Sequence, residues 1–257
     1  LDPAYAQAWA LLAVAQRNRL YTASLGDNGL AAAARALELD PRLAEAHAAR
    51  AGALAAAGQY VEAEGSIATA LQLDPESPDV HREAGRLAMH QRRHQDAAVH
   101  FEKAFALVDT DVSAGSLLIT CYNALGDAAG LRRIGAKLLE RCEKALAKDA
   151  DNGSVMAAMF TALLTVGEHE RARDWARRAV LMDPDNLGMR YNIACDLIVN
   201  VGDLDLAIEL LTPVVGSCGR EQLEWLKSDP DMDPIRADAR FQSMVAAAEQ
   251  RLGATRT

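Results

Sequence analysis

The sequence contains few aromatic residues and no excess of positive charge. Aromatic residues make up 5% of its 257 residues, whereas apolar residues together make up 50%. Alanine and leucine therefore supply much of the apolar content, as they do in packed helices. The formal net charge is -9. Because nucleic-acid phosphates and anionic membranes attract proteins with a basic face, we expect neither of them to be a partner.

The sequence also lacks paired cysteines and long hydrophobic runs. No Cys-x-x-Cys motif occurs among Cys121, Cys142, Cys195 and Cys218, which argues against a thiol redox site or a zinc knuckle and favours buried, reduced thiols. No uncharged stretch reaches the roughly 18 apolar residues that a membrane span requires, and no secretory leader pattern opens the chain. These absences predict a soluble, cytoplasmic protein.

One short string recurs along the chain. Leu-Asp-Pro occurs at residues 1–3, 39–41 and 73–75, and Met-Asp-Pro occurs at 182–184. The prolines at 41 and 75 are 34 residues apart, a spacing that is typical of repeated helix pairs. An alanine followed by a large apolar residue recurs at or near the same step, at Ala36, Ala70, Ala104, Ala145 and Ala179.

A glycine followed by a polar residue marks a second point inside most of these repeats. Glycine ends a helix readily because it tolerates positive φ, and an acidic or polar residue suits the first turn of the next helix. The pattern predicts a helix, a tight turn and a second helix in each repeat. The pairs are Gly26-Asp27, Gly58-Gln59, Gly126-Asp127, Gly167-Glu168 and Gly202-Asp203.

Taken together, these residues resemble the tetratricopeptide repeat (TPR) family over nearly the whole chain. The likeness is best in the second repeat, where Leu54, Gly58, Ala63, Ile67, Ala70 and Pro75 stand at the family's packing positions. The resemblance implies an all-α, right-handed superhelical solenoid. We expect it to span residues 1–215, followed by a helical cap at 216–257. The predicted repeats are 4–41, 42–75, 76–109, 110–150, 151–184 and 185–215.

The two ends of the chain lead to different expectations. Residues 1–3 read as the tail of a repeat whose preceding helix is absent, so we expect the chain to be part of a longer protein. The string from Glu224 to Phe241 resembles the terminal segment of repeat arrays in multidomain bacterial signalling proteins, such as adenylate-cyclase-type regulators. We expect residues 223–252 to cap the last repeat with Trp225, Ile235, Phe241 and Met244.

Two groups of residues suggest metal sites. Asp229, Asp231 and Asp233 alternate as in a calcium loop, but Pro234 stands where that loop needs glycine and Arg240 where it needs glutamate. We therefore expect these aspartates to cap helices and form turns. Four histidines lie within twenty residues, without cysteines or a clear carboxylate set to complete a coordination sphere. We interpret them as solvated turn residues and expect no metal or other cofactor. They are His81, His90, His94 and His100.

The sequence carries no catalytic signature. It has neither a Gly-x-x-x-x-Gly-Lys phosphate loop nor a Gly-x-Ser-x-Gly nucleophile elbow, and no strand-turn-helix context in which either would work. We therefore expect no enzymatic activity and a function in binding.

The TPR resemblance implies that the first helix of each repeat lines a concave groove that holds a peptide or a partner domain. Helical spacing then selects polar residues of the third and fourth repeats as the candidate binding surface. Arginines beside hydroxyl and amide groups suit an acidic partner, although an ordinary solvated face is the alternative. The candidate residues are Arg82, Arg86, His90, Ser116, Thr120 and Asn123.

A second functional hypothesis is self-association into a homo-oligomer. It would be favoured if apolar residues of the last repeats formed one exposed patch on the inner face. The residues concerned are Leu164, Tyr191, Ile198 and Val199.

Overall fold

The structure is a computed structural model that describes residues 5–23, 29–150, 152–219, 222–223, 226–227 and 229–254. Every regular element among these residues is a helix, which confirms the predicted all-α class. No helix in the described part is both long and apolar enough to cross a membrane. The contacts divide the chain into an N-terminal unit, residues 1–141, and a C-terminal unit, residues 142–257.

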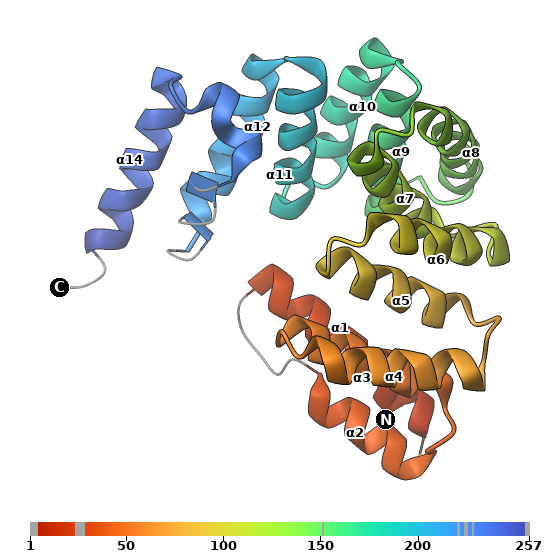
Figure 1. Cartoon of the computed structure of the whole chain (residues 1–257). Helices are drawn as coiled ribbons and strands as arrows, with labels where there is room; N and C mark the ends of the chain where they lie inside the picture. The colour runs from red at the N-terminus through yellow and green to blue at the C-terminus, as the bar shows by residue number, and fades with distance from the viewer. Residues whose placement is uncertain are drawn as a thin grey trace. The chain divides into compact units, whose positions relative to one another are not determined.

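The N-terminal unit consists of helix pairs that follow the predicted repeats (Figure 1). Helix α1 packs on α2, α3 on α4 and α5 on α6, and the first helix of each of the first two pairs also contacts the first helix of the next. The helices are α1 (Ala6–Ala23), α2 (Leu30–Leu39), α3 (Ala44–Ala56), α4 (Tyr60–Leu73), α5 (Pro78–His90), α6 (His94–Leu107), α7 (Val112–Leu125) and α8 (Ala128–Leu146), whose residues from Cys142 on are assigned to the C-terminal unit.

The C-terminal unit continues with paired helices and ends in shorter elements. The second helix of the sixth repeat does not stop at the Thr212-Pro213 pair, where the sequence period ends. It runs through Pro213 to Ser217, two residues past the predicted boundary. The elements are α9 (Gly153–Thr165), α10 (His169–Met182), α11 (Leu187–Asp196), the π-helix η1 (Leu197–Val201), α12 (Leu204–Ser217), the 3-10 helix η2 (Pro230–Ile235) and α14 (Ala239–Ala254).

The turns inside the repeats use left-handed backbone, as the glycine pattern predicts. The φ angle is 74° at Gly58, 67° at Gly126, 81° at Gly167 and 73° at Gly202. In the third repeat, Arg92 occupies the equivalent turn with a φ of 58°. An L side chain in this region is strained because its Cβ approaches the backbone, so this repeat keeps the turn geometry at a cost. The pair Gly26-Asp27 lies outside the described residues.

A hydrogen bond to a proline carbonyl recurs where one repeat passes into the next. His47 Nε2 lies 2.9 Å from the carbonyl oxygen of Pro41, and His81 Nε2 lies 2.9 Å from that of Pro75. In the C-terminal unit, Arg190 Nε donates to Pro184 over the same distance. The interpretation of His81 as a solvated turn residue is therefore wrong: it lies half-buried in the first turn of α5.

The third repeat ends without a proline, and Arg141 stabilises this boundary instead. Its guanidinium donates to the carbonyl oxygens of Phe105 at 2.8 Å, Val108 at 2.9 Å and Asp111 at 3.2 Å. The same group lies 3.4 Å from the centroid of the Phe105 ring. The bonds to Phe105 and Val108 satisfy carbonyls at the C-terminal end of α6, where the last turn lacks partners within the helix.

The last segment packs against the sixth repeat. Ile235 and Phe241 are buried, and α14 contacts α12, as expected for a cap. Thr212 Oγ1 lies 3.3 Å from Met244 Sδ. Trp225, the fourth residue expected in this cap, lies outside the described residues. The carboxylate of Asp229 accepts a hydrogen bond from Asp231 N at 2.9 Å and thereby caps η2, which is the capping role predicted for these aspartates.

Candidate functional site

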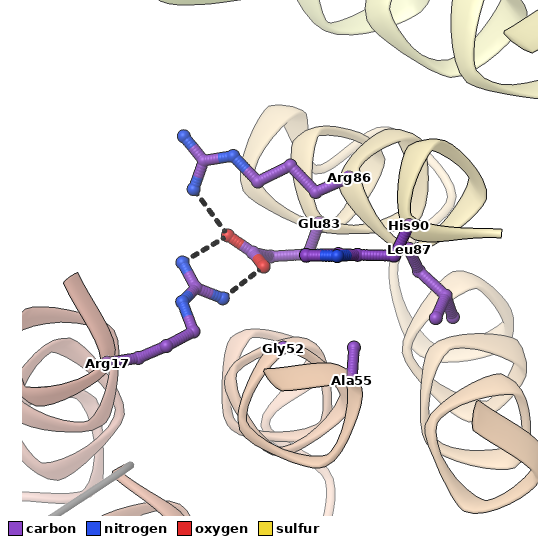
Figure 2. Close-up of a pocket in the computed structure, with 7 residues that line it drawn as sticks. All are labelled: Arg17, Gly52, Ala55, Glu83, Arg86, Leu87 and His90. Atoms are coloured by element: carbon purple, nitrogen blue, oxygen red, sulfur yellow. Dashed lines mark hydrogen bonds and ion pairs between the residues drawn. The ribbon is translucent and has the colours of Figure 1, made fainter. Parts of the chain in front are cut away.

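A pocket of about 150 Å³ lies among the first helices of the first three repeats, within the N-terminal unit. Helices α1, α3 and α5 all contribute to it, so residues far apart in the sequence meet there (Figure 2). The lining residues are Arg17, Gly52, Ala55, Glu83, Arg86, Leu87 and His90.

Two guanidinium groups share one carboxylate at this pocket. Arg17 Nη2 donates to Glu83 Oε1 at 3.0 Å, and Arg17 Nη1 bonds the other carboxylate oxygen. Arg86 Nη1 donates to Glu83 Oε1 at 3.2 Å. The side chains of Arg17 and Glu83 are only 4% and 8% exposed, so their charges interact in a medium that screens them weakly. The three groups carry a net positive charge.

Gly52 makes the bond between Arg17 and Glu83 possible. A Cβ atom on Gly52 would overlap Arg17 Nη1 and would lie 2.7 Å from Glu83 Oε2. Figure 2 shows Arg17 reaching the carboxylate from the side of α1, while Arg86 approaches the carboxylate from another side. None of these three residues, Arg17, Gly52 and Glu83, was predicted from the sequence.

His90 contributes an imidazole that is mainly neutral near pH 7. Partial burial, followed by the nearby Arg17 guanidinium, lowers the pKa of His90 below its usual value of 6.5, while Glu83 opposes the shift. A neutral imidazole can donate one hydrogen bond and accept another. The pocket therefore combines a charged donor group with a neutral polar group.

Arg82, a predicted binding residue, already bonds two carboxylates. Its guanidinium bonds Asp79 and donates to Asp111 Oδ2 at 3.0 Å. Asp111 also caps α7, because its other carboxylate oxygen accepts from Ser113 N at 2.9 Å and Ala114 N at 3.1 Å. The guanidinium of Arg82 thus links α5 to the start of α7. Of the two predicted arginines, Arg86 is the one that lines the pocket.

The predicted residues of α7 form a neutral polar face. Ser116 Oγ donates to Val112 O at 3.2 Å and Thr120 Oγ1 donates to Ser116 O at 3.4 Å, while Asn123 is exposed. Because each hydroxyl proton is directed to its own helix, the hydroxyl oxygens remain available as acceptors. The site residues predicted on α5 and α7 lie in the same unit, but only Arg86 and His90 line the pocket.

The apolar residues proposed for self-association do not form one exposed patch. Ile198 is buried at 4% exposure, whereas Val199 is 55% exposed. Leu164 and Tyr191 are half-buried, and the Tyr191 hydroxyl bonds the carboxylate of Asp229. The apolar surface at these positions is therefore divided among residues in different environments.

A three-residue cluster in the C-terminal unit has atoms of metal-ligand type within 4.8 Å of one another: Cys195, Asp229 and Asp231. Two of its groups have structural tasks or are held in an unreactive form. Asp229 caps η2 and bonds Tyr191. Burial raises the pKa of the Cys195 thiol to about 12, so the thiol is protonated at neutral pH in the metal-free protein. We assign this cluster to the support of the turn.

Comparison with known proteins identifies the fold. No protein-family model matches the chain. A rice (Oryza sativa subsp. japonica) U-box domain-containing protein 70 is 29% identical over 154 residues, which are 58% of this chain and 18% of that protein. The chain thus spans about a fifth of the length of this relative.

Among solved structures, human IFIT1 in a dimer with m7Gppp-AAAA aligns with a TM-score of 0.67 and 16% identity, over 98% of this chain and 62% of that one. TTC0263, a TPR protein of Thermus thermophilus, aligns with a TM-score of 0.54 and 19% identity, over 76% and 100%. Pseudomonas aeruginosa pilF aligns with a TM-score of 0.52 and 20% identity, over 87% and 97%. With its paired helices and a repeat length at or near 34 residues in most repeats, the chain has the tetratricopeptide repeat fold.

Proposed function

We propose that the chain is a protein-interaction module that binds an acidic segment of a partner protein at the pocket beside Arg86 and along the polar face of α7. The observation that carries this proposal is the arrangement of charge in the pocket, where one buried carboxylate is shared by two guanidinium groups. An incoming carboxylate would accept hydrogen bonds from the N–H groups of Arg86 that do not bond Glu83. The repeat fold, which presents the first helices of successive repeats side by side, supports the same function.

Arg86 is the group best suited to contact the partner. Its side chain is 33% exposed, and one of its nitrogens bonds Glu83 over 3.2 Å. A guanidinium has five N–H donors in a planar fork that matches a carboxylate, so a single bond to Glu83 leaves donors for a ligand. The acceptors on α7 would then bind backbone N–H groups of the same segment.

This module would act within a larger signalling or regulatory protein and would not catalyse a reaction itself. The likeness of residues 224–241 to the terminal segments of repeat arrays in bacterial signalling proteins supports the first part. The lack of a phosphate loop or nucleophile elbow in the sequence supports the second.

The proposal is tested with an array of extended peptides that differ in their number of aspartates and glutamates and in whether they end in a free carboxylate. We expect the wild-type protein to bind acidic peptides, with affinity that falls as salt is raised. Arg86→Glu should abolish this binding. Arg132→Glu, a charge reversal at an exposed arginine of α8, is the matched control. Equal binding by the two variants would refute recognition at this pocket.

A second candidate function is self-association through the C-terminal unit. It is favoured by two exposed apolar side chains there, Leu181 at 81% and Val199 at 55% exposure. Light scattering across a range of protein concentrations distinguishes the two functions. A dimer that Leu181→Glu or Val199→Glu converts to a monomer would support self-association, whereas a wild-type monomer at all concentrations would refute it.

A further inference from the structure

The structure brings together two histidines that the sequence pattern does not pair. His81 lies on α5 and His100 lies on α6, and their Nδ1 atoms are 3.1 Å apart. The rings are 5.4 Å apart between centroids and tilted by 38°. Both residues are half-buried. Two ring nitrogens therefore point at each other from neighbouring helices.

The hydrogen bond at the far side of His81 fixes its tautomer. His81 Nε2 lies 2.9 Å from the carbonyl oxygen of Pro75, and a carbonyl only accepts, so Nε2 carries the proton. Neutral His81 then has a lone pair on Nδ1, directed at His100. A histidine that donates one N–H to a backbone carbonyl and offers its other nitrogen has the arrangement found around metal-ligating histidines.

We propose that His81 and His100 form a binding site for a divalent transition-metal ion that prefers imidazole ligands, such as Zn²⁺ or Ni²⁺. Metal–nitrogen bonds of about 2.0–2.1 Å place two ligand nitrogens about 3.4 Å apart in a tetrahedral site and about 3.0 Å apart at right angles. The observed separation of 3.1 Å falls between these values. Imidazole nitrogens are ligands that suit Zn²⁺, Cu²⁺ and Ni²⁺.

Binding of the ion requires no release of a proton from the two histidines. In the metal-free protein, His100 Nδ1–H donates to the lone pair of His81 Nδ1. When the ion binds, His100 passes to its other neutral tautomer, with the proton on Nε2, and both Nδ1 lone pairs coordinate the ion.

A second pocket of the N-terminal unit borders His100 and leaves room for water ligands, although His81 is not among its lining residues. It has a volume of about 210 Å³, and His100 is one of its lining residues. Asp96 lines the same pocket four residues before His100 on α6, a spacing that places both on one helix face. Arg93 also lines the pocket, but it is paired with Glu64 at 3.2 Å and with Asp96 at 3.3 Å. The remaining ligands of the ion are water molecules in this pocket.

The repeat itself shows that the fold does not require this histidine pair. In the second repeat, the residue equivalent to His81 is His47, which bonds a proline carbonyl over the same 2.9 Å. The residue equivalent to His100 is Ser66, which donates instead to Glu62 O at 3.0 Å. The second repeat folds in the same way without a second imidazole, so the pair in the third repeat is an addition to the common architecture.

The test is calorimetric titration of the full chain with Zn²⁺ and, separately, Ni²⁺, together with the visible spectrum of the Co²⁺ complex. We expect one ion per chain in the wild type. His100→Gln and His81→Gln should each weaken binding at least about tenfold, since even the loss of an outer-shell partner costs 10- to 100-fold. The glutamine amide can still donate to Pro75 O, and circular dichroism checks the fold of each variant.

His47→Gln is the matched control, because it changes the equivalent histidine of the second repeat, and it should bind the ion as the wild type does. The Cys195→Ser variant tests the cluster in the C-terminal unit. Equal affinity in the wild type and both single variants of the pair would overturn the proposal. So would one-ion binding that is lost in Cys195→Ser or His47→Gln and retained in His100→Gln.

Discussion

The second and third repeats of the N-terminal unit share a backbone plan but differ in the side chains they carry. Their turns have φ angles of 74° at Gly58 and 58° at Arg92, and the amide that follows each turn bonds a helix carbonyl at 2.9 Å in both. The second repeat, however, has small residues at positions where the third has charged or imidazole side chains. At a step of 34 residues, the pairs are Ala49 and Glu83, Gly52 and Arg86, and Ser66 and His100.

This difference shows how a repeat protein creates a site without changing its fold. In the second repeat, Gly52 leaves room for the side chain of Arg17. The third repeat supplies the charged and polar side chains Glu83, Arg86 and His90. A buried ion pair adds little net stability compared with apolar packing. We therefore infer that the main role of the bond between Arg17 and Glu83 is to fix the positions of Arg86 and His90. Substitutions that convert one repeat into the other test this interpretation.

The largest effect is expected for Glu83→Ala, which gives the third repeat the alanine of the second. The change removes the carboxylate from the buried guanidinium of Arg17, and breaking such a pair costs about 3–5 kcal/mol. Urea denaturation followed by circular dichroism measures the loss. In the double variant with Arg17→Met we expect much of the stability to return, because no buried charge then remains. A loss below about 1 kcal/mol for Glu83→Ala would contradict the role given to this pair.

The boundary after each repeat provides the next comparison. Pro75 ends the second repeat, whereas Asp109 stands at the equivalent position of the third and Arg141 bonds the neighbouring carbonyls. Arg141→Met keeps an apolar stem but removes the donors, so we expect a loss of about 1.5–3 kcal/mol, the range for hydrogen bonds to charged groups. Arg132→Met, on an exposed face of the same helix, should change the unfolding midpoint little. Similar midpoints for both variants would assign the stability of this boundary to other contacts.

Gly52→Ala tests whether the second repeat must leave space for the side chain of Arg17. The added methyl group overlaps Arg17 Nη1 and crowds Glu83 Oε2, and overpacking of this kind costs about 1–3 kcal/mol. In the Arg17→Met background the cost should be smaller, because the group that is displaced is gone. A double-mutant cycle of thermal or urea unfolding measures this coupling. Independent, additive effects of the two changes would show that Gly52 serves another purpose.

Much of the fold could be predicted from the sequence because the repeat period reflects the local requirements of turns and helix interfaces. Positive φ in a turn favours glycine and a tight helix interface favours alanine, so both recur at or near a 34-residue step in most repeats and are visible in one sequence. Helical spacing likewise placed Arg86 and His90 on the first helix of the third repeat, where they line the pocket. The predicted end of the solenoid at residue 215 lies two residues before the end of α12 at Ser217.

The candidate site itself depends on contacts between helices, which the period does not record. Arg17 and Glu83 are 66 residues apart in the sequence. Gly52 allows them to bond because it has no side chain, and this role is not visible in the sequence. The pair formed by His81 and His100 is not visible in the sequence for a similar reason, because the two residues lie on neighbouring helices and not on one helix. Comparing each position with its equivalent one repeat earlier would have singled out Arg86 and His100, which replace Gly52 and Ser66.

The smallest effect is expected at the turn of the third repeat, where Arg92→Gly introduces the residue that the second repeat has at Gly58. Arg92 adopts a φ of 58°, and this conformation costs a non-glycine residue roughly 1–2 kcal/mol. Glycine removes that strain but loses more chain entropy on folding, so we expect a net gain of about 0.5–1 kcal/mol, seen as a higher urea midpoint. Arg92→Ala, which removes the same side chain but keeps a Cβ, should give no such gain. Equal midpoints for the glycine and alanine variants would show that the backbone at Arg92 carries no strain.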